Sequence, residues 1–253
     1  TLQQTINDIR IKMWQQQPAY FLDEAIIEAN GTMAPTFGQC KQGMDISYNG
    51  QWGYHPLVVS LANTGEPLFL DNRSGNRPSY EGAAQRFDQA AAMARRAGFK
   101  SILFRGDTDF TQTSELECWD DAGDIRFIFG INAMPNLYDI VENLPRRVWK
   151  RLKRRVKREV KTAPRQRPEN VKERIVEERE FENIELQAEW VAEFSYQPTK
   201  CKKSYRVIAV WKDLEVTQGQ TVLFDDDKCF FYITNDWDSE PEAIVFEAND
   251  RCN

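Results

Sequence analysis

Three polar residues follow apolar runs at positions where their side-chain oxygens could bind a metal ion. Asn30 comes directly after AIIEA, and Asp107 comes directly after ILFRG, with Asp109 two residues later. Carboxylate and carbonyl oxygens are ligands that suit Mg²⁺ or Mn²⁺. Residues two apart in an extended chain point the same way, so Asp109 could be a second ligand beside Asp107. The residues alone leave an alternative open, in which Gly-Asp-Thr-Asp is a capping turn before the next helix.

The composition indicates that any catalytic metal site would have to use oxygen ligands. The chain has 253 residues and a single histidine, His55, which removes most catalytic triads and histidine-ligated metal sites. Its five cysteines are scattered without a CxxC pair, which argues against a zinc site or a disulfide framework and for a reducing cytosol. Two divalent ions about 3.5–4 Å apart can activate a water and stabilise the leaving oxygen of a phosphodiester.

The apolar pattern predicts how Asn30 and Asp107 could meet. The expected elements are strands at 20–29, 100–104 and 125–132, a hairpin at 54–72, a helix at 80–97 capped by Ser79, and a short helix at 113–123. A right-handed crossover through the helix would place the first strand beside the strand at 100–104. Open α/β sheets keep their sites at the carboxyl ends of such parallel neighbours. We therefore expect an α/β fold with Asn30 and Asp107 at one edge of the sheet.

The net charge of −6 hides a strong segregation. Residues 146–174 hold fourteen of the 33 Lys and Arg residues and three of the 39 acids, so this segment is +11 and the remainder is −17. A run of charges is usually a solvated face, and that alternative stays open. A cluster this dense also suits a phosphate backbone, to which affinity falls steeply with salt. The expected phosphate contacts are Arg147, Lys150, Arg151, Arg154, Arg155 and Arg158.

The second half of the chain changes character at residue 143. Val148, Leu152, Val156 and Val160 recur at spacings of four, which predicts a basic helix over 143–163. Alternating acidic and strand-like stretches follow, the last of them EAIVF at 242–246, and they indicate an inserted, largely β subdomain. No run of about 18 apolar residues and no signal peptide is present. We therefore expect no membrane partner and a cytoplasmic location.

Four segments of the chain share a pattern with known proteins, within a similarity that extends over nearly the whole chain: EANGTMAPT, KQGMDISYNGQWGYHPLVVSLANTGEPLFL, NRSGNRPS and FRGDTDF. Together they resemble the catalytic core of a DDE-type transposase from bacterial insertion sequences. The resemblance implies an RNase H-like mixed sheet with flanking helices, interrupted by a β-rich insertion. It implies Mg²⁺-dependent cleavage and joining of double-stranded DNA at transposon ends and target, by a dimer in the DNA complex. A bacterial, nucleoid-associated protein is expected.

The resemblance also assigns positions to the catalytic acids. The family's first Asp falls on Asn30, its second on Asp107, and its third acid, a Glu four residues after an Arg, would follow Arg251 at a position beyond Asn253. The implied site residues are thus Asn30 and Asp107 for catalysis, with Asp109 added as a metal ligand. The expected division is a first core part at 1–142, the basic helix at 143–163, the insertion at 164–240 and a return to the core at 241–253.

Asn30 has a direct chemical consequence. Asn keeps the shape of Asp but offers a neutral carbonyl, so with the third acid also outside this sequence we expect a catalytically impaired chain. Glu28, two residues earlier and longer, could substitute in part. One alternative is a domesticated transposase that only binds DNA. Another is a haloacid-dehalogenase-like phosphatase, although Glu28 stands where that family needs a nucleophilic Asp.

Overall fold

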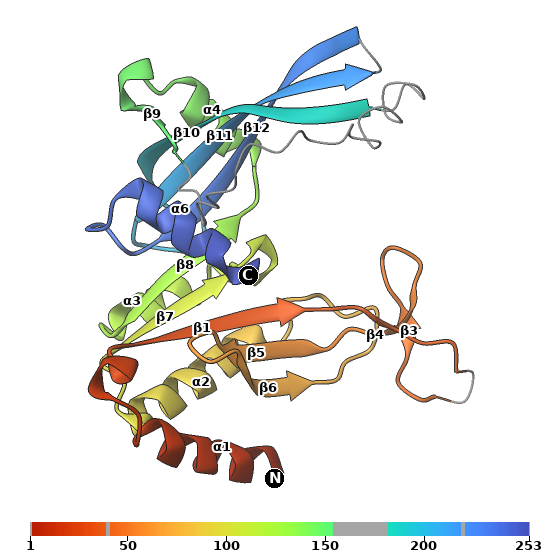
Figure 1. Ribbon diagram of the computed structural model, residues 1–253, viewed down its shortest axis with the longest axis vertical. Helices are drawn as coiled ribbons and strands as arrows, with labels where there is room; N and C mark the ends of the chain where they lie inside the picture. The colour runs from red at the N-terminus through yellow and green to blue at the C-terminus, as the bar shows by residue number, and fades with distance from the viewer. Residues whose placement is uncertain (1, 39–40, 154–181, 219–220, 253) are drawn as a thin grey trace, which may run out of the picture. The chain divides into compact units, whose positions relative to one another are not determined.

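The central element is a mixed sheet, and the apolar runs of the first half of the chain supply its first five strands in the order of the sheet. In the computed structural model its neighbouring strands are β6 (Glu66–Asp71), β5 (Leu57–Leu61), β1 (Glu24–Gly31), β7 (Ser101–Gly106) and β8 (Ile125–Ile131) (Figure 1). β6, β5 and β1 are antiparallel, whereas β1, β7 and β8 run parallel. The prediction that the first strand lies beside the strand before Asp107 is confirmed, and the fold is the expected mixed α/β sheet with flanking helices.

The structure describes residues 2–38, 41–153, 182–218 and 221–252, which form two compact units. The first unit contains the sheet above and comprises residues 1–132, 194–207 and 232–253. The second comprises residues 133–193 and 208–231. The long strands β10 (Glu182–Tyr196), β11 (Tyr205–Gln218) and β12 (Thr221–Thr234) each contribute residues to both units.

The parallel strands β1, β7 and β8 present two different faces because their side chains alternate. Ile27, Phe104 and Phe127 are fully buried on one face and are register neighbours. Glu28, Arg105 and Arg126 belong to the opposite alternation. The same alternation assigns Asn30 to the charged face.

Helices cover the sheet at positions that the sequence predicts only in part. α2 (Ala83–Ala97) is Ala-rich and ends at Gly98, whose φ of 100° is left-handed, as expected for a helix C-terminus. Its N-cap is Gly82 and no side chain caps it, so the prediction that Ser79 is the cap is wrong. The remaining elements of this half are α1 (Leu2–Trp14), η1 (Ala19–Leu22), η2 (Thr108–Phe110) and α3 (Leu116–Asp121).

A small three-stranded sheet follows β1 in the chain. Its order is β2 (Ala34–Pro35), β4 (Trp52–Tyr54) and β3 (Asp45–Ile46). Gly53 in β4 has a φ of 159° and an added Cβ there would lie 2.2 Å from the carbonyl oxygen of Ala34, so only glycine allows β2 to approach.

The prediction of a strand at 242–246 is wrong, because these residues belong to α6 (Pro241–Asn249). Pro241 occupies the first turn of this helix, where the missing N–H costs nothing. Pro241, Ile244 and Val245 are buried at spacings of three and four, which is a helical period. α6 packs on β8, and η4 (Asp250–Cys252) continues the chain.

The helix predicted over 143–163 is wrong for its described part. α4 (Pro135–Glu142) ends first, and the chain continues as η3 (Arg146–Val148) and the short strand β9 (Lys150–Arg151). β9 pairs with β10, and the Leu152 N–H donates to the carbonyl of Glu189. Strand pairing therefore overrides the spacing of four. Residues 154–163 lie outside the described residues. No helix in the described part of the chain has the length and apolar character needed to cross a membrane.

Candidate functional site

The register between β1 and β7 brings Asn30 and Asp107 to neighbouring positions. Glu28 pairs with Arg105 as the last parallel register partner, and Asn30 and Asp107 each lie two residues further along. Neighbouring strands are about 4.8 Å apart, so the two side chains lie at the same edge and on the same alternation of the sheet. Asn30 is exposed, and the Asp107 side chain is 46% exposed. The predicted convergence of these two positions is present in the fold.

Asp107 has two neighbours that fix its carboxylate. Its Oδ1 accepts a hydrogen bond of 3.0 Å from the backbone N–H of Asp109, so Asp107 caps the 3-10 helix η2. Its Oδ2 lies 3.3 Å from the guanidinium of Arg251, which follows α6 in η4. The capping alternative is therefore correct for η2, and it does not compete with a site role because nearly half of the side chain remains exposed.

Arg251 is the residue that the family pattern uses to locate the third acid. Its ion pair with Asp107 brings the chain after α6 to the carboxyl end of β7. The segment that follows α6 therefore approaches the residue at which β7 ends.

Asp109 does not extend the strand as the spacing argument assumed. It lies within η2, where the chain turns, so the rule that residues two apart share a side does not apply. Its exposed side chain instead lines a cavity together with Gly31.

The donor set of the described residues does not by itself fit a two-metal centre. Within the described ranges no three Asp, Glu, His or Cys side chains are grouped so as to hold a metal ion. Asp107 supplies one carboxylate and Asn30 supplies a neutral amide at the neighbouring strand end. This is one carboxylate of the expected three, so the described residues alone would bind a metal weakly.

Glu28 does not stand in for the missing carboxylate, because it is paired with Arg105. The Nε of Arg105 donates to Oε1 of Glu28 at 2.6 Å, and the side chains are 5% and 16% exposed. Arg105 also donates to the backbone carbonyl of Glu247 in α6 at 2.5 Å. Glu28 therefore positions the guanidinium of Arg105, and Arg105 in turn anchors α6 through its bond to the Glu247 carbonyl.

A second arginine on the same face ties α6 to the sheet. Arg126 donates to both carboxylate oxygens of Glu247 at 2.8 Å, to Asp236 at 2.9 Å and to Glu24 at 3.2 Å. Burial alone would lower the pKa of Arg126, but its hydrogen bonds to Glu247 and the charges of Glu247 and Glu24 outweigh burial and raise it. These ion pairs fix the helix that delivers Arg251. Sequence reasoning missed them, although an Arg inside each of two buried apolar strands is a readable signal.

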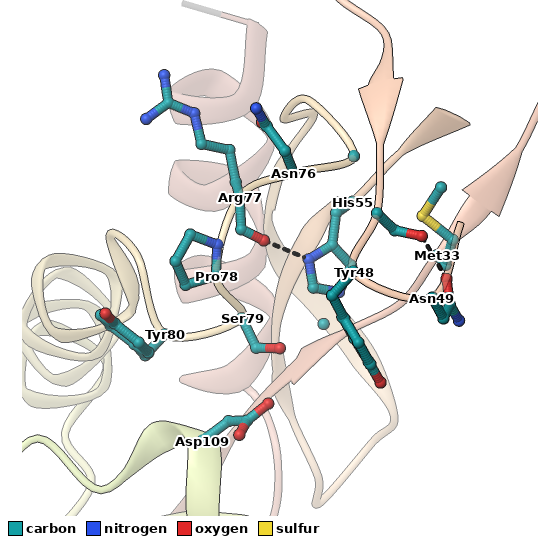
Figure 2. Close-up of a pocket in the computed structure, with 13 residues that line it drawn as sticks. Met33, Tyr48, Asn49, His55, Asn76, Arg77, Pro78, Ser79, Tyr80 and Asp109 are labelled. Carbon is teal, nitrogen blue, oxygen red and sulfur yellow. Dashed lines mark hydrogen bonds between the residues drawn. The ribbon is translucent and has the colours of Figure 1, made fainter. Parts of the chain in front are cut away.

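A cavity of about 620 Å³ lies beside the carboxyl end of β1 (Figure 2). The imidazole Nδ1 of His55 is 2.8 Å from the carbonyl oxygen of Arg77. A Cβ added at Gly31 would lie 3.1 Å from His55 Nε2 and 3.2 Å from Ser79 Cβ, so glycine allows this close approach. Sequence reasoning missed the cavity, whose lining comes from separated loops: Gly31, Met33, Ser47, Tyr48, Asn49, His55, Gly75, Asn76, Arg77, Pro78, Ser79, Tyr80 and Asp109.

The structure describes three of the six cationic residues that are predicted to contact DNA. Arg147, Lys150 and Arg151 are exposed in the second unit. Arg154, Arg155 and Arg158 lie outside the described residues.

Comparison with known proteins identifies a family and solved structures with a similar fold. A sequence profile described as "Transposase DDE domain group 1" matches residues 1–245. A cryo-EM structure of the piggyBac transposase synaptic complex with hairpin DNA is similar at a TM-score of 0.45 with 10% sequence identity, and the match covers 97% of this chain and 41% of that chain. This chain thus spans about two fifths of that protein. No curated protein matches the sequence.

Proposed function

This chain belongs to the transposase DDE domain family, and from that premise we propose that it is the core of an enzyme that cuts and joins DNA strands. Its substrates would be the ends of an insertion sequence and the target duplex, and its metal would be Mg²⁺ or Mn²⁺. We further propose that it acts as a dimer on DNA, in the cytoplasm of a bacterium at the nucleoid.

The observation that carries the proposal is the meeting of three chain segments at one edge of the sheet. Asn30 and Asp107 follow the last register pair of two parallel strands, and Arg251 contacts Asp107 from the segment after α6. A metal would be held by Asp107, by the oxygen of residue 30, and by a third carboxylate supplied after Arg251. When bound, it would polarise the phosphodiester and lower the pKa of an attacking water.

Asn30 weakens the metal site that this enzyme would need. The amide oxygen can coordinate a cation, but it carries no negative charge. The chain's own side chains would still bind DNA and present Asp107, while the affinity for the metal would be weak. We therefore propose that the unmodified chain has little or no strand-cutting activity.

A second candidate function is DNA binding without catalysis, and Asn30 is the observation that favours it. A protein retained only for binding would not need the charge at position 30, while it would keep the scaffold and the basic segment. The Glu28–Arg105 pair also leaves Glu28 with a structural role in place of a catalytic one.

The test is DNA nicking in the presence of Mn²⁺. We expect Asn30→Asp, in a chain extended to include a Glu four residues after Arg251, to cut a supercoiled plasmid more than about 100-fold faster than the unmodified chain. Loss of even an indirect metal partner costs about 10–100-fold. The matched control adds Asp107→Asn to the restored chain and should abolish cutting. Cutting by the unmodified chain at the restored rate would refute the impairment, and no cutting by the restored chain would favour the binding-only function.

The basic segment is tested separately by the salt dependence of duplex binding. Each phosphate contact contributes about −0.9 to the slope of log affinity against log salt. Replacing Arg147, Lys150 and Arg151 by Ala should make the slope shallower by about 2 to 3 units. The replacement Arg96→Ala, which removes an exposed cation paired with Asp8 in the first unit, should leave the slope unchanged. A slope that stays equal in the triple variant would exclude these contacts.

A further inference from the structure

The cavity at the end of β1 adjoins the candidate catalytic edge. Gly31, which lines it, directly follows Asn30, and Asp109, which also lines it, lies two residues after Asp107. Asn30 belongs to the other alternation of β1, but the cavity and Asp107 lie at the same ends of β1 and β7. A DNA strand whose phosphate lies at Asp107 therefore has a neighbouring nucleotide within reach of this cavity.

Several polar groups of the cavity are available to a ligand. Because a backbone carbonyl only accepts, Nδ1 of His55 carries the hydrogen in its bond to Arg77, and in the neutral ring Nε2 is left as an acceptor. Among the described residues, neither this Nε2 nor the hydroxyls of Tyr48 and Ser79 have a hydrogen-bond partner. Figure 2 shows His55, Tyr48, Ser79 and Asp109 gathered around the same space.

The charges of the cavity favour an uncharged group over a phosphate. Of the lining residues, all of which are described, Arg77 is the one permanent cation and Asp109 the one carboxylate. Arg77 is already paired with Glu81 at 3.1 Å. Phosphate recognition uses several unpaired cations, whereas a hydroxyl, an imidazole and a carboxylate can bind the donors and acceptors on a base edge.

Two tyrosines supply the flat surface that a base needs. Tyr48 is fully exposed at 102% and Tyr80 is 50% exposed, so neither ring is held in the core. Bases stack on such rings in proteins that bind single strands. A volume of about 620 Å³ also lies within the range of about 300–1,000 Å³ typical of small-molecule sites, which suits one nucleoside.

We propose that this cavity binds one unpaired nucleobase of the DNA strand that is processed at Asp107. Tyr48 stacks on the base, and His55 and Ser79 bind its polar edge. The assignment rests on the proposed function, since it takes the cavity as part of a DNA-processing site.

The experiment compares two labelled DNA probes by fluorescence anisotropy with the unmodified chain. One probe is a blunt duplex, and the other carries a three-nucleotide single-stranded extension at one end. We expect the extension to raise affinity about tenfold, in line with the loss that removal of one stacking aromatic causes. Tyr48→Ala should abolish the gain, and His55→Ala should reduce it. Because Tyr48 is fully exposed, its removal leaves the core intact.

The matched control is Tyr20→Ala, which removes another exposed tyrosine, 77% exposed, in η1 before the opposite end of β1. It should keep the full gain. An extension that gives no gain, or a gain that survives in Tyr48→Ala, would overturn the subsite while leaving the proposed function intact. If the chain did not bind the blunt duplex at low salt, the proposed function would fail. The subsite would then be tested with a free single strand, and binding of that strand that does not depend on Tyr48 would overturn the subsite as well.

Discussion

The two faces of β1, β7 and β8 are stabilised by different interactions, aromatic packing on one face and ion pairs on the other. On one face, Phe104 packs with Phe87 of α2 and Trp119 of α3, with ring centroids 4.7 and 5.2 Å apart. Phe129 completes this cluster 5.7 Å from Trp119. Burial of such rings is favourable in many arrangements because the hydrophobic effect has no direction.

On the opposite face, each buried charge needs a specific partner. Arg105 and Arg126 are satisfied by Glu28, Asp236 and Glu247, and both arginines contact α6. A half-buried cation without its partner is costly, so this face accepts few arrangements of the helix. The aromatic face thus stabilises the sheet, whereas the charged face decides where α6 and Arg251 lie.

The largest effect should follow from damage to the aromatic face. Phe104→Ala should lower the free energy of unfolding by about 3–5 kcal/mol, because a fully buried ring leaves a cavity. Urea denaturation followed by tryptophan fluorescence measures this loss. Phe37→Ala, at a position 95% exposed, should change stability by less than about 0.5 kcal/mol. A loss under about 1 kcal/mol for Phe104→Ala would mean that this face is not the main source of stability.

Damage to the charged face should cost less stability and change the site more. Arg126→Met leaves Glu247, Asp236 and Glu24 without their shared partner, which should cost about 3 kcal/mol. Hydrogen exchange should then increase in α6 more than in α2. The control Arg95→Met breaks the partly exposed pair with Asp124 and should cost under about 1 kcal/mol. Equal effects of the two variants would remove the distinction between a positioning network and an ordinary surface pair.

The elements that the sequence predicts well are those decided by local pattern. Apolar runs ending at Asn30 and at Gly106 define β1 and β7, and Gly98 ends α2. Their parallel pairing follows from the handedness of one crossover. The convergence of Asn30 and Asp107 is therefore accessible without coordinates.

The features that the sequence does not predict depend on partners distant in the chain. The run at 242–246 contains β-branched residues, yet contacts with β8 select the helix α6. Leu152 satisfies a helical spacing, yet it directly follows strand β9, and its N–H donates to the carbonyl of Glu189 in β10. The cavity is lined by loops that are far apart in the chain, from Gly31 to Asp109, and no local pattern in these loops shows that they meet.

The smallest predicted effect separates charge from shape on the charged face. Burial alone would raise the pKa of Asp236, but hydrogen bonds from Ser239 and Asp238 and from Arg126 outweigh it and lower the pKa. A carboxylate with a lowered pKa contributes stability that is present above its unfolded value of about 3.9 and is lost as pH falls through the folded value.

Asp236→Asn keeps an oxygen for the N–H groups of Ser239 and Asp238 but removes the charge that faces Arg126. We expect a loss of about 1–2 kcal/mol at pH 7, measured by urea denaturation. The loss should shrink as pH falls below about 4, since the Asp236 carboxylate becomes protonated first in the unfolded chain and then, at its lower pKa, in the folded chain. Asp238→Asn, at an exposed neighbour, should show no such convergence. If the curves for Asp236→Asn and the native chain stayed parallel down to pH 3, the charge of Asp236 would not stabilise this face, and Arg126 and α6 would be held by the contacts of Glu247, Glu24 and Arg105 instead.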